Sequence, residues 1–389
     1  MGGKLRRFDW AMFAAMLALV GIGTVSIWSA GNARAEAVFH GMWISNLVTA
    51  AVGLVLYLAL AFADYRKTLG FLSVPAYAVS LLMLVVVLLV GSTVYGGRRW
   101  LWFFQPSEVA KICVLALVAA LYGGLWPKFE PIRRTFRGFV LAGVLIGAPV
   151  LLILAEPDLG TALTLAPAAV LTVFVAGVWR KGLVAIATVL GLAALLTLGA
   201  VYEAEKPGVS PERRERIMRY VPLKPHQVKR IRVFLFPAQD QMGAGYNLRQ
   251  AQISIGSGGL TGKGVGKGET NHLKYLPQAI SMNDFIFCVY AEETGFVGSL
   301  VLLALFGVLV LSGCRVAFVA EDACGRLLAL GVTTLVFAHV YVNIAMSVGL
   351  VPITGLPLPF ISSGRTFLVM VMCGLGLVQS VSIHREESR

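Results

Sequence analysis

Acidic and basic residues interrupt the apolar runs of this chain at a few places, and these residues are its candidates for chemistry. Asp284 opens one run, where partial desolvation would raise the basicity of its carboxylate and make it a candidate general base. Asp284 could equally cap a helix, although Asn283 beside it would serve as well. Glu108 and Lys111 stand one helical turn apart and could form a structural ion pair or belong to a site. Asp158 could likewise be a helix cap or a site residue.

A glycine-rich segment, residues 256–264, looks like a phosphate-binding loop. It fails the Walker pattern, because Ser257 stands where the first glycine belongs and Gly264 follows Lys263 in place of Ser or Thr. ATP binding is therefore not expected. Backbone amides and a lysine could still hold a lipid-linked diphosphate, and the candidates are Gly258, Gly259 and Lys263.

The composition is that of a membrane protein with many spans. Residues of the set AVILMFWYC fill 57% of the 389 positions and charged residues only 14%, against a usual charged share of about a quarter. This excludes a soluble enzyme, a disordered chain and a secreted disulfide scaffold. The net charge of +13 is explained by basic loops that orient helices and contact anionic lipid, so no nucleic-acid partner is expected. The five cysteines and five histidines are scattered, which predicts neither a disulfide framework nor a metal site.

Ten apolar runs approach the length of about 20 residues that a membrane span needs. We therefore predict an all-α polytopic membrane protein that forms a single membrane domain over residues 1–389. The first run could be mistaken for a signal peptide, but it is long for one and nine more runs follow. The ten runs are 9–29, 41–62, 71–91, 107–124, 138–155, 160–179, 182–202, 284–314, 325–350 and 366–383.

Lysines and arginines fall mainly on alternate loops and on the two termini. Fifteen lie on that side, against four on the short loops of the other side. The positive-inside rule then places both termini in the cytoplasm and the long loop 203–283, between the seventh and eighth runs, outside it. Within this loop, the mixed basic and apolar segment 211–236 predicts a helix on the membrane surface, which would anchor the loop or recruit substrate.

With this orientation, the charged groups that are costly in a membrane gather at the outer face. Such groups usually mark a pathway or a reaction site, and scattered structural charges would not share one face. The segment 355–360 breaks the chain between the ninth and tenth runs, which is tolerated only where backbone is buried in protein or lines a cavity. The outer-face charges are Arg98, Arg99, Glu108, Lys111, Glu156, Asp158, Asp284, Glu292 and Glu293.

Five motifs occur in the order of a known family. They are Arg99-Trp100 followed by Gln105-Pro106-Ser107-Glu108 and Lys111; Glu156-Pro157-Asp158-Leu159-Gly160-Thr161-Ala162; Gly256-Ser257-Gly258-Gly259-Leu260 with Gly262-Lys263-Gly264; Asp284-Phe285-Ile286-Phe287 with Glu292-Glu293; and Gly355-Leu356-Pro357-Leu358-Pro359-Phe360. One motif alone is weak, but five in register across ten spans are specific. The chain resembles the SEDS family (shape, elongation, division and sporulation) over nearly its whole length.

The resemblance implies a ten-helix peptidoglycan glycosyltransferase of the bacterial inner membrane that polymerises lipid II. It also implies a class B penicillin-binding protein as partner, within the elongation or division machinery. Asp284 matches the essential loop aspartate of the family. Positions of the family's outer cavity are matched by Arg99, Glu108, Lys111, Asp158 and Lys263. The residues that we predict to bind substrate are Arg98, Arg99, Gln105, Glu108, Lys111, Glu156, Asp158, Gly258, Gly259, Lys263, Glu292, Glu293, Ser362 and Arg365.

The chain departs from the family pattern at two places. Gln278 stands where members usually have Glu after Leu-Pro, and the spacer from there to Asp284 is two residues longer. After the Pro-rich breaker, residues 362–366 read Ser-Ser-Gly-Arg-Thr where the family has Ser-Tyr-Gly-Gly-Ser. Arg365 is therefore an added outer-face cation near the presumed site.

In the implied reaction, a sugar hydroxyl of one lipid-linked disaccharide attacks the anomeric carbon of another, and undecaprenyl diphosphate leaves. Asp284 would accept the proton. The leaving diphosphate gains charge, which cations would stabilise; the candidates are Arg99, Lys111, Lys263 and Arg365. A divalent cation, Mg²⁺ or Mn²⁺, could share this role, although no dedicated ligand cage is present in the sequence. Two other functions stay open: a lipid II flippase or transporter, and a non-catalytic scaffold that activates a penicillin-binding protein.

Overall fold

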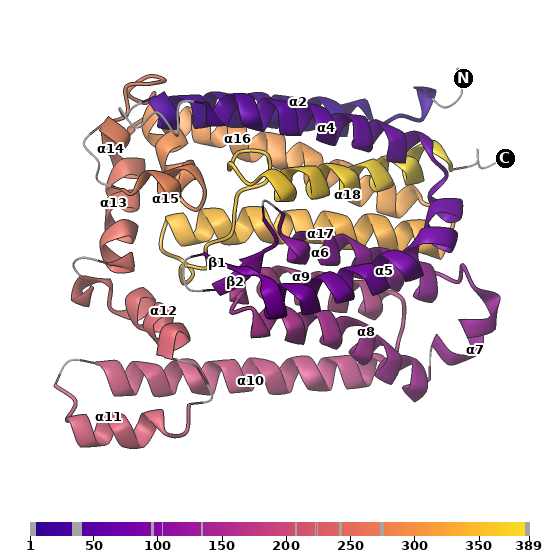
Figure 1. The fold of residues 1–389 in the computed structure, drawn as a ribbon, viewed down its shortest axis with the longest axis horizontal. Helices are drawn as coiled ribbons and strands as arrows, with labels where there is room; N and C mark the ends of the chain where they lie inside the picture. The colour runs from indigo at the N-terminus through magenta and orange to yellow at the C-terminus, as the bar shows by residue number, and fades with distance from the viewer. Residues whose placement is uncertain are drawn as a thin grey trace.

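The computed structural model describes residues 5–32, 41–94, 97–102, 104–133, 135–206, 208–221, 223, 225–240, 243–272 and 276–385. Its long helices run side by side and form one bundle (Figure 1). The chain enters and leaves this bundle at the same end, where the Arg7 guanidinium donates a hydrogen bond to the Arg385 carbonyl oxygen. This agrees with the prediction that both termini lie on one side of a membrane.

Eight of the described helices are long and apolar enough to cross a membrane, which confirms a multi-pass helical membrane protein. Two further helices, α6 (Pro106–Tyr122) and α9 (Leu159–Val175), occupy the fourth and sixth predicted spans but have only 17 residues each. A straight crossing needs about 20 residues, so the total of ten spans stays a prediction. The eight are α2 (Trp10–Asn32), α4 (Met42–Phe62), α5 (Tyr65–Val90), α8 (Phe136–Ala155), α10 (Arg180–Glu205), α16 (Ile286–Val319), α17 (Ala323–Ser347) and α18 (Arg365–Ile383).

Helix α6 lies at the centre of the bundle. It packs against α5, α9 and α17, and nearly all of its residues are buried. A helix that is apolar on every side is stable only where its neighbours cover it completely. Its first turn therefore carries Glu108 and Lys111 into the protein interior. The short 3-10 turn η1 (Pro127–Phe129) and helix α7 (Glu130–Arg133) lead from α6 to α8.

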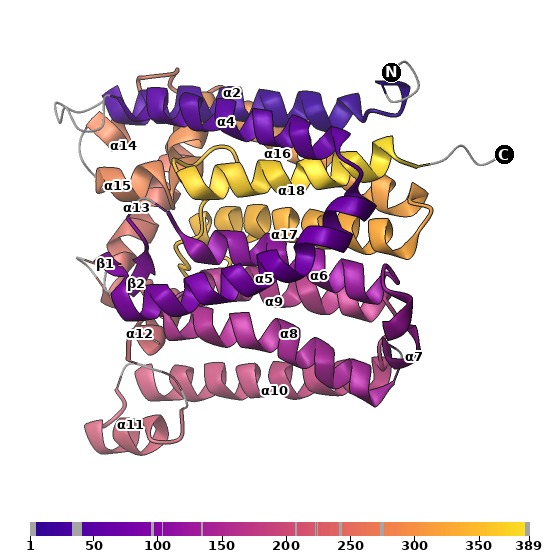
Figure 2. The same ribbon diagram turned by 45° about the vertical axis from the view of Figure 1, so that its right-hand side comes forward.

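Helix α10 lies at the edge of the bundle (Figures 1 and 2). Only 6% of the residues in its most apolar stretch are buried, and its exposed side chains include Val189, Leu190, Leu195 and Leu196. A contiguous apolar surface of this kind marks contact with lipid or with another protein. The contacts that hold the following loop are made by Glu205, the last residue of α10.

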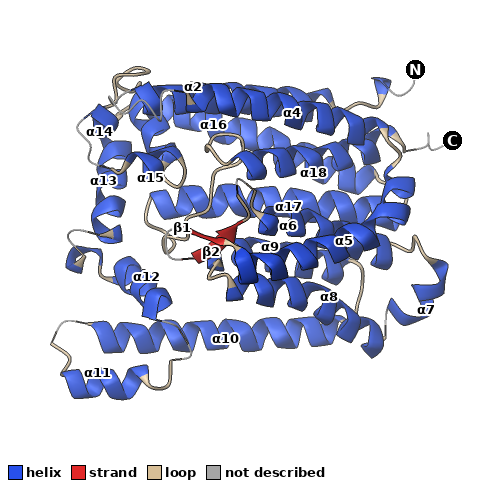
Figure 3. Cartoon of the chain, in the orientation of Figure 1, coloured by secondary structure: helices blue, strands red, loops and turns tan. Residues whose placement is uncertain are grey.

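The loop 203–283 is mostly helical (Figure 3). The expected single helix over 211–236 is wrong: this segment forms two helices, α11 (Pro211–Met218) and α12 (Pro225–Leu235). Pro225 explains the break, because proline fits the first turn of a helix but not its interior. The loop continues through the 3-10 turn η2 (Pro237–Gln239) and helices α13 (Ala244–Ser257), α14 (Glu269–His272) and α15 (Gln278–Met282).

A two-stranded antiparallel hairpin between α5 and α6 was not predicted. Strand β1 (Ser92–Val94) pairs with β2 (Gly97–Trp100) in the register Ser92↔Trp100, Thr93↔Arg98 and Val94↔Gly97. The sequence signal was the pair Gly96-Gly97, because glycines favour tight hairpin turns. The hairpin matters because its second strand carries Arg98 and Arg99.

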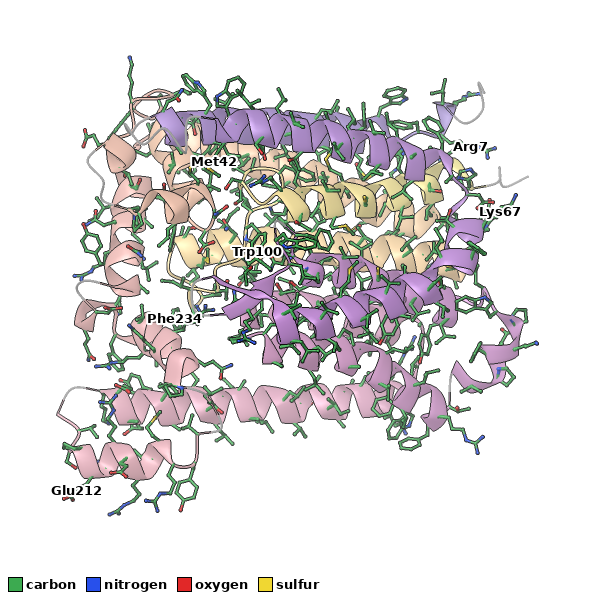
Figure 4. The ribbon with its side chains drawn as sticks, viewed as in Figure 1. Arg7, Met42, Lys67, Trp100, Glu212 and Phe234 are labelled. Carbon is green, nitrogen blue, oxygen red and sulfur yellow. The ribbon has the colours of Figure 1, made fainter. Side chains whose placement is uncertain are left out.

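The candidate site residues gather toward the end of the bundle opposite the termini. Figure 4 shows Arg7 and Lys67 at one end, and Met42, Trp100 and Phe234 toward the other. The beginnings of α6, α9, α16 and α18 and the loop helices α11–α15 all belong to this second end (Figure 1). The described charged residues that the sequence assigns to the outer face therefore share one end of the molecule.

Candidate active site

Asp284 lies between α15 and α16, two residues before the spanning helix begins. Neither Asp284 nor Asn283 caps α16, because the N-cap position is Phe285 and no side chain accepts a hydrogen bond there. The Asp284 carboxylate is partly exposed, and within the described part of the chain it accepts no hydrogen bond. The helix-cap explanation is thus excluded. The carboxylate keeps both oxygens available for a proton or a substrate.

The backbone around Asp284 is fixed by Asn343 of α17. The Asn343 Nδ2 donates to the Asp284 carbonyl oxygen at 3.0 Å and to the Leu356 carbonyl oxygen at 2.6 Å. This amide therefore ties the α15–α16 junction to the extended segment 351–364 between α17 and α18. The sequence analysis did not identify Asn343. The sequence feature that could have indicated Asn343 is a polar amide inside an apolar run, because such an amide is costly without hydrogen-bond partners.

The extended segment forms the wall that faces Asp284. Gly355 has a φ of 74°, and a Cβ added there would lie 3.4 Å from Oδ2 of Asp284. Ser362 holds the other side of this segment: its Oγ donates to the Asn283 carbonyl oxygen at 2.6 Å and accepts from the Leu358 amide at 2.8 Å. Ser362 was predicted to bind substrate, but its hydroxyl is buried and already has both a donor and an acceptor. Its observed contacts are structural.

Two guanidinium groups act on the Asp284 carboxylate. Burial raises the pKa of Asp284 to about 6, while the cations Arg230 and Arg99 lower it. Arg230 comes from α12, and its Nη1 donates to the Thr354 carbonyl oxygen at 3.1 Å, next to Gly355. Burial lowers the pKa of Arg230, followed by repulsion from Arg99, while Asp158 and Asp284 raise it. These opposing effects show one electrostatically coupled cluster of Arg99, Asp158, Arg230 and Asp284, which we call the Asp284 cluster.

The position of Arg230 depends on the end of α10. The buried carboxylate of Glu205 binds Arg232 Nε at 3.1 Å and Arg214 Nη2 at 2.6 Å. These contacts join α10 to both α11 and α12. Arg232 follows Arg230 by two residues and binds Glu205, the residue that anchors the loop. Arg230 instead points toward Thr354. A cavity of about 510 Å³ lies beside the anchor, between α10, α11 and α12.

Arg99 is held by the turn between α8 and α9. Its guanidinium donates to the Pro157 carbonyl oxygen and, from Nε, to the Glu156 carbonyl oxygen at 3.3 Å. Its Nη1 lies 3.8 Å from Asp158 Oδ1. Asp158 also caps α9, because it accepts hydrogen bonds from the Thr161 amide at 3.2 Å and from Thr161 Oγ1 at 2.8 Å. Asp158 is therefore a helix cap. It also lies beside Arg99, and its function as a site residue stays a prediction.

Two other predicted residues adjoin this cluster. The Gln105 Nε2 donates to Asp158 Oδ2 at 3.3 Å. The side chain of Glu156 is fully buried and its two carboxylate oxygens have no hydrogen-bond partner among the described residues. Burial and the neighbouring Asp158 raise the pKa of Glu156 to about 8, against a lowering by Arg99. The environment of Glu156 therefore favours the neutral carboxyl group, which can donate a hydrogen bond.

Glu108 and Lys111 form a buried ion pair, with 2.7 Å between Glu108 Oε2 and Lys111 Nζ. The Lys111 Nζ also lies 2.9 Å from His339 Nε2 and 5.0 Å from the centroid of the Phe367 ring. The His339 Nε2 in turn lies 3.2 Å from Thr164 Oγ1. Lys111 is 1% exposed and its charge is already paired. The contacts of Lys111 in this structure therefore join α6, α9, α17 and α18, and a contact with the leaving group stays a prediction. His339, one of five scattered histidines, was not predicted to lie beside Lys111.

The glycine-rich segment supports a break in α16. At Gly295 the backbone leaves helical geometry, with φ 69° and ψ −164°. The amides of Lys263 and Gly264 donate to the Glu292 and Glu293 carbonyl oxygens at 3.0 and 2.9 Å. In return, two carbonyl oxygens of the segment accept hydrogen bonds from amides beyond the break: Phe296 to Gly259 at 2.9 Å and Val297 to Leu260 at 3.1 Å. These four hydrogen bonds, which we call the glycine clasp, replace those that the break removes.

The glycine clasp uses backbone groups that the predicted phosphate-binding function of this segment would require. The amides of Lys263 and Gly264 are already used by α16, so they cannot face an anion. The Lys263 Nζ is also paired, at 2.8 Å from Glu292 Oε1 and 3.4 Å from Glu269 Oε2. Gly258 packs on the chain, because a Cβ there would lie 2.2 Å from the Ala291 carbonyl oxygen.

Gly262→Ala should destabilise the protein without directly touching substrate. Gly262 has a φ of 78°, and a Cβ there would lie 2.1 Å from the Glu293 carbonyl oxygen. Strain at such a position costs about 1–3 kcal/mol, and the clash adds to it. We expect a lower melting temperature for the detergent-solubilised protein. Gly256→Ala is the matched control, because nothing lies within 4 Å of its added Cβ. Equal melting temperatures for both variants would contradict the clasp.

The remaining predicted residues lie apart from the Asp284 cluster. Arg98 is exposed, and its Nη1 donates to the Leu88 carbonyl oxygen at 3.4 Å. Glu293 is buried and accepts a hydrogen bond from Ser29 of α2. Arg365 is exposed at the first residue of α18. Within the described ranges, no group of three or more His, Cys, Asp or Glu side chains could hold a metal ion.

The fold agrees with the comparisons to known proteins. The sequence profile of the cell cycle protein family that groups FtsW, RodA and SpoVE matches residues 9–387. The chain therefore belongs to the FtsW/RodA/SpoVE family. One curated relative, the peptidoglycan glycosyltransferase MrdB of Escherichia coli, is 35% identical over 383 residues, which cover 97% of this chain and 94% of the relative.

Two solved structures share the fold. One belongs to a peptidoglycan synthase complex described as coordinating polymerization and crosslinking; it is 30% identical with a TM-score of 0.73 and covers 97% of this chain and 99% of that chain. The other is the rod shape determining protein RodA of Thermus thermophilus, 28% identical with a TM-score of 0.66, covering 97% of this chain and 98% of that chain. Similarity over whole chains extends beyond the short motifs to the arrangement of the helices.

Proposed function

We propose that this chain is a peptidoglycan glycosyltransferase that polymerises lipid II at the outer face of the bacterial inner membrane. Its membership of the family and the name of its E. coli relative support this activity. The observation that carries the proposal is the Asp284 carboxylate, which has no hydrogen-bond partner in the described structure and faces the cations Arg99 and Arg230. The reaction requires a base that is free to accept a proton and, beside it, cations that stabilise the leaving diphosphate.

The reaction joins a sugar hydroxyl to an anomeric carbon. Asp284 accepts the hydroxyl proton as the oxygen forms its bond to the anomeric carbon of the second lipid-linked saccharide. The bond from that carbon to the diphosphate oxygen breaks, and the electron pair leaves with the diphosphate. Arg99 and Arg230 stabilise this growing negative charge, since both are fixed before the reaction by backbone carbonyl oxygens. One displacement on an α-linked donor gives a β-linked product.

The carboxyl group of Glu156 and the cap Asp158 have a supporting function in this mechanism. Asp158 contacts Arg99 and Gln105 and thereby orients both toward the cluster. Burial raises the pKa of Glu156 and so favours its neutral form, which reduces its opposition to the positive charge of Arg99.

The partner proposed for this chain is a class B penicillin-binding protein. The support is the similar solved chain that belongs to a complex of polymerization and crosslinking. Glycan strands made by the transferase would pass to the transpeptidase of such a partner. The exposed apolar side of α10 is available for lipid or for another transmembrane helix.

The test of the proposed function is glycan-strand formation from labelled lipid II by the purified full chain with its cognate class B partner. A β-lactam blocks the transpeptidase so that the strands stay uncrosslinked and can be resolved by gel electrophoresis. We expect polymer. Its absence, in a preparation that binds lipid II, would contradict the transferase and favour transport or scaffolding.

The rate of polymerisation should depend on pH through Asp284. A general base must be ionised, and the pKa of Asp284 is raised by burial to about 6. We therefore expect kcat/KM to rise with pH through about 6 and to level off above it. An aspartate of ordinary pKa, about 3.9, would give a constant rate above pH 5. Initial rates measured between pH 5 and pH 8 at constant ionic strength distinguish the two profiles.

A further inference from the structure

A polar pocket lies between the first turn of α4 and the first turn of α18. Its volume is about 220 Å³, and it is lined by Gly41, Met42, Ser45, Asn46, Ser363 and Arg365. This volume is smaller than the roughly 300–1,000 Å³ of a site for a drug-sized molecule. The pocket therefore fits a headgroup and not a whole lipid.

Asn46 is the unusual residue of this pocket. It lies in the spanning helix α4, is 2% exposed, and neither its Nδ2 nor its Oδ1 has a hydrogen-bond partner in the described structure. A buried amide without partners is costly, and in a membrane span it marks a functional position. Nothing in the packing of α4 on α18 uses this amide. A ligand in the pocket would supply the missing partners.

Arg365 gives the pocket its charge. The residue is exposed, and none of the residues that line the pocket is acidic. Arginine binds phosphate through a planar fork of N–H donors, and asparagine adds a further donor. The Ser45 hydroxyl beside them is also able to donate.

The pocket is connected to the active site through a short path. The Ser363 Oγ donates to Asn283 Oδ1 at 2.5 Å, and the Ser363 amide donates to the Met282 carbonyl oxygen at 3.2 Å. Asn283 precedes Asp284 in the chain. A ligand held by Arg365 and Asn46 would thus lie against the segment that positions the Asp284 carboxylate.

We propose that the pocket of Asn46 and Arg365 binds a phosphate group carried by a membrane lipid, at a site separate from the Asp284 cluster. The lipid lies with its chains along the exposed apolar surface of α4, which includes Leu47 and Val48, and its phosphate accepts hydrogen bonds from the Arg365 guanidinium and the Asn46 amide. This site does not rest on the transferase proposal, because binding requires no turnover.

The test is native mass spectrometry of the full chain in detergent, titrated with undecaprenyl diphosphate in one arm and phosphatidylglycerol in the other. Arg365→Gln and Asn46→Ala should each weaken the retention of one lipid molecule by about tenfold, since each removes a hydrogen bond to a charged group. Arg137→Gln is the matched control, because Arg137 is an exposed arginine at the beginning of α8, at the other end of the bundle. It should bind both lipids as the wild type does.

The two arms identify the source of the phosphate. A loss confined to undecaprenyl diphosphate supports a site for the polyprenyl lipid, and a loss in both arms supports a general phospholipid site. Asn46→Ala should also keep or raise the melting temperature in lipid-free detergent, because it removes a buried amide without partners. Unchanged binding of both lipids by both variants would overturn the proposal. A lower melting temperature of Asn46→Ala with unchanged binding would assign Asn46 to packing alone and overturn it too.

Discussion

Asp284→Asn should lower the rate of lipid II polymerisation by about 10²–10⁴-fold and leave the fold intact. The amide has the shape of the carboxylate but cannot accept the hydroxyl proton. The carboxylate makes no hydrogen bond within the described structure, and the contact that fixes this residue is to its carbonyl oxygen, from Asn343. The substitution therefore removes the chemistry and keeps the contacts. Labelled lipid II, with the partner transpeptidase blocked, gives the rate.

The control for this substitution is Asp240→Asn. Asp240 lies in the same loop and accepts a hydrogen bond from the Gly245 amide at 3.3 Å, which an asparagine oxygen can also accept. Its activity should equal that of the wild type. The melting temperatures of both variants should stay close to that of the wild type. Wild-type rates from a folded Asp284→Asn protein would disprove the base and move the chemistry to another residue.

The sequence could reveal Asp284 and Arg99 because each one stands out locally. Asp284 opens an apolar run, and Arg99 lies on a loop where the charge pattern predicts few cations. Arg230 has no such local signal, since it lies in the segment 211–236 among many other basic residues. The position of Arg230 depends on the ion pairs of Glu205, which are tertiary contacts. A pattern of residue types therefore predicts three of the four residues of the Asp284 cluster but not the cation that α12 supplies.

The glycine-rich segment shows that one local sequence pattern fits both a phosphate loop and a structural support for a broken helix. The glycines are needed because several of them adopt positive φ, including Gly262 and Gly264. A phosphate loop requires the same backbone, so composition cannot separate the two. The broken helix at Gly295 decides between them, because it uses the amides that a phosphate would need. This break is formed by residues more than thirty positions away and has no signal within the segment itself.

The membrane fold was predictable, whereas the partners of buried charges were not. Long apolar runs determine the helices directly, and eight of them are found as spans. Glu108 and Lys111 were correctly paired from their spacing. The further contact of Lys111 with His339 joins residues 228 positions apart. No sequence period or spacing predicts such a contact. In the structure it makes Lys111, a predicted substrate-binding residue, part of the packed interior.

Arg230→Gln should lower kcat by about 10²–10³-fold, the usual effect of removing one fixed donor that stabilises charge in the transition state. It should also move the acidic limb of the pH profile to higher pH. The reason is that Arg230 lowers the pKa of Asp284 by its positive charge, so its loss allows that pKa to rise above about 6. A residue that only packs would not produce this shift.

The matched control for Arg230 is the residue before it. Lys229→Gln removes the same charge from the same helix, but Lys229 is exposed and lines the cavity beside Glu205. This variant should keep the wild-type pH profile and nearly the wild-type kcat. The two profiles, measured on the same partner and lipid II preparation, separate a specific effect at Asp284 from a general loss of positive charge in the loop. Identical profiles for both variants would show that Arg230 does not act on the base. Arg99 alone would then stabilise the leaving diphosphate.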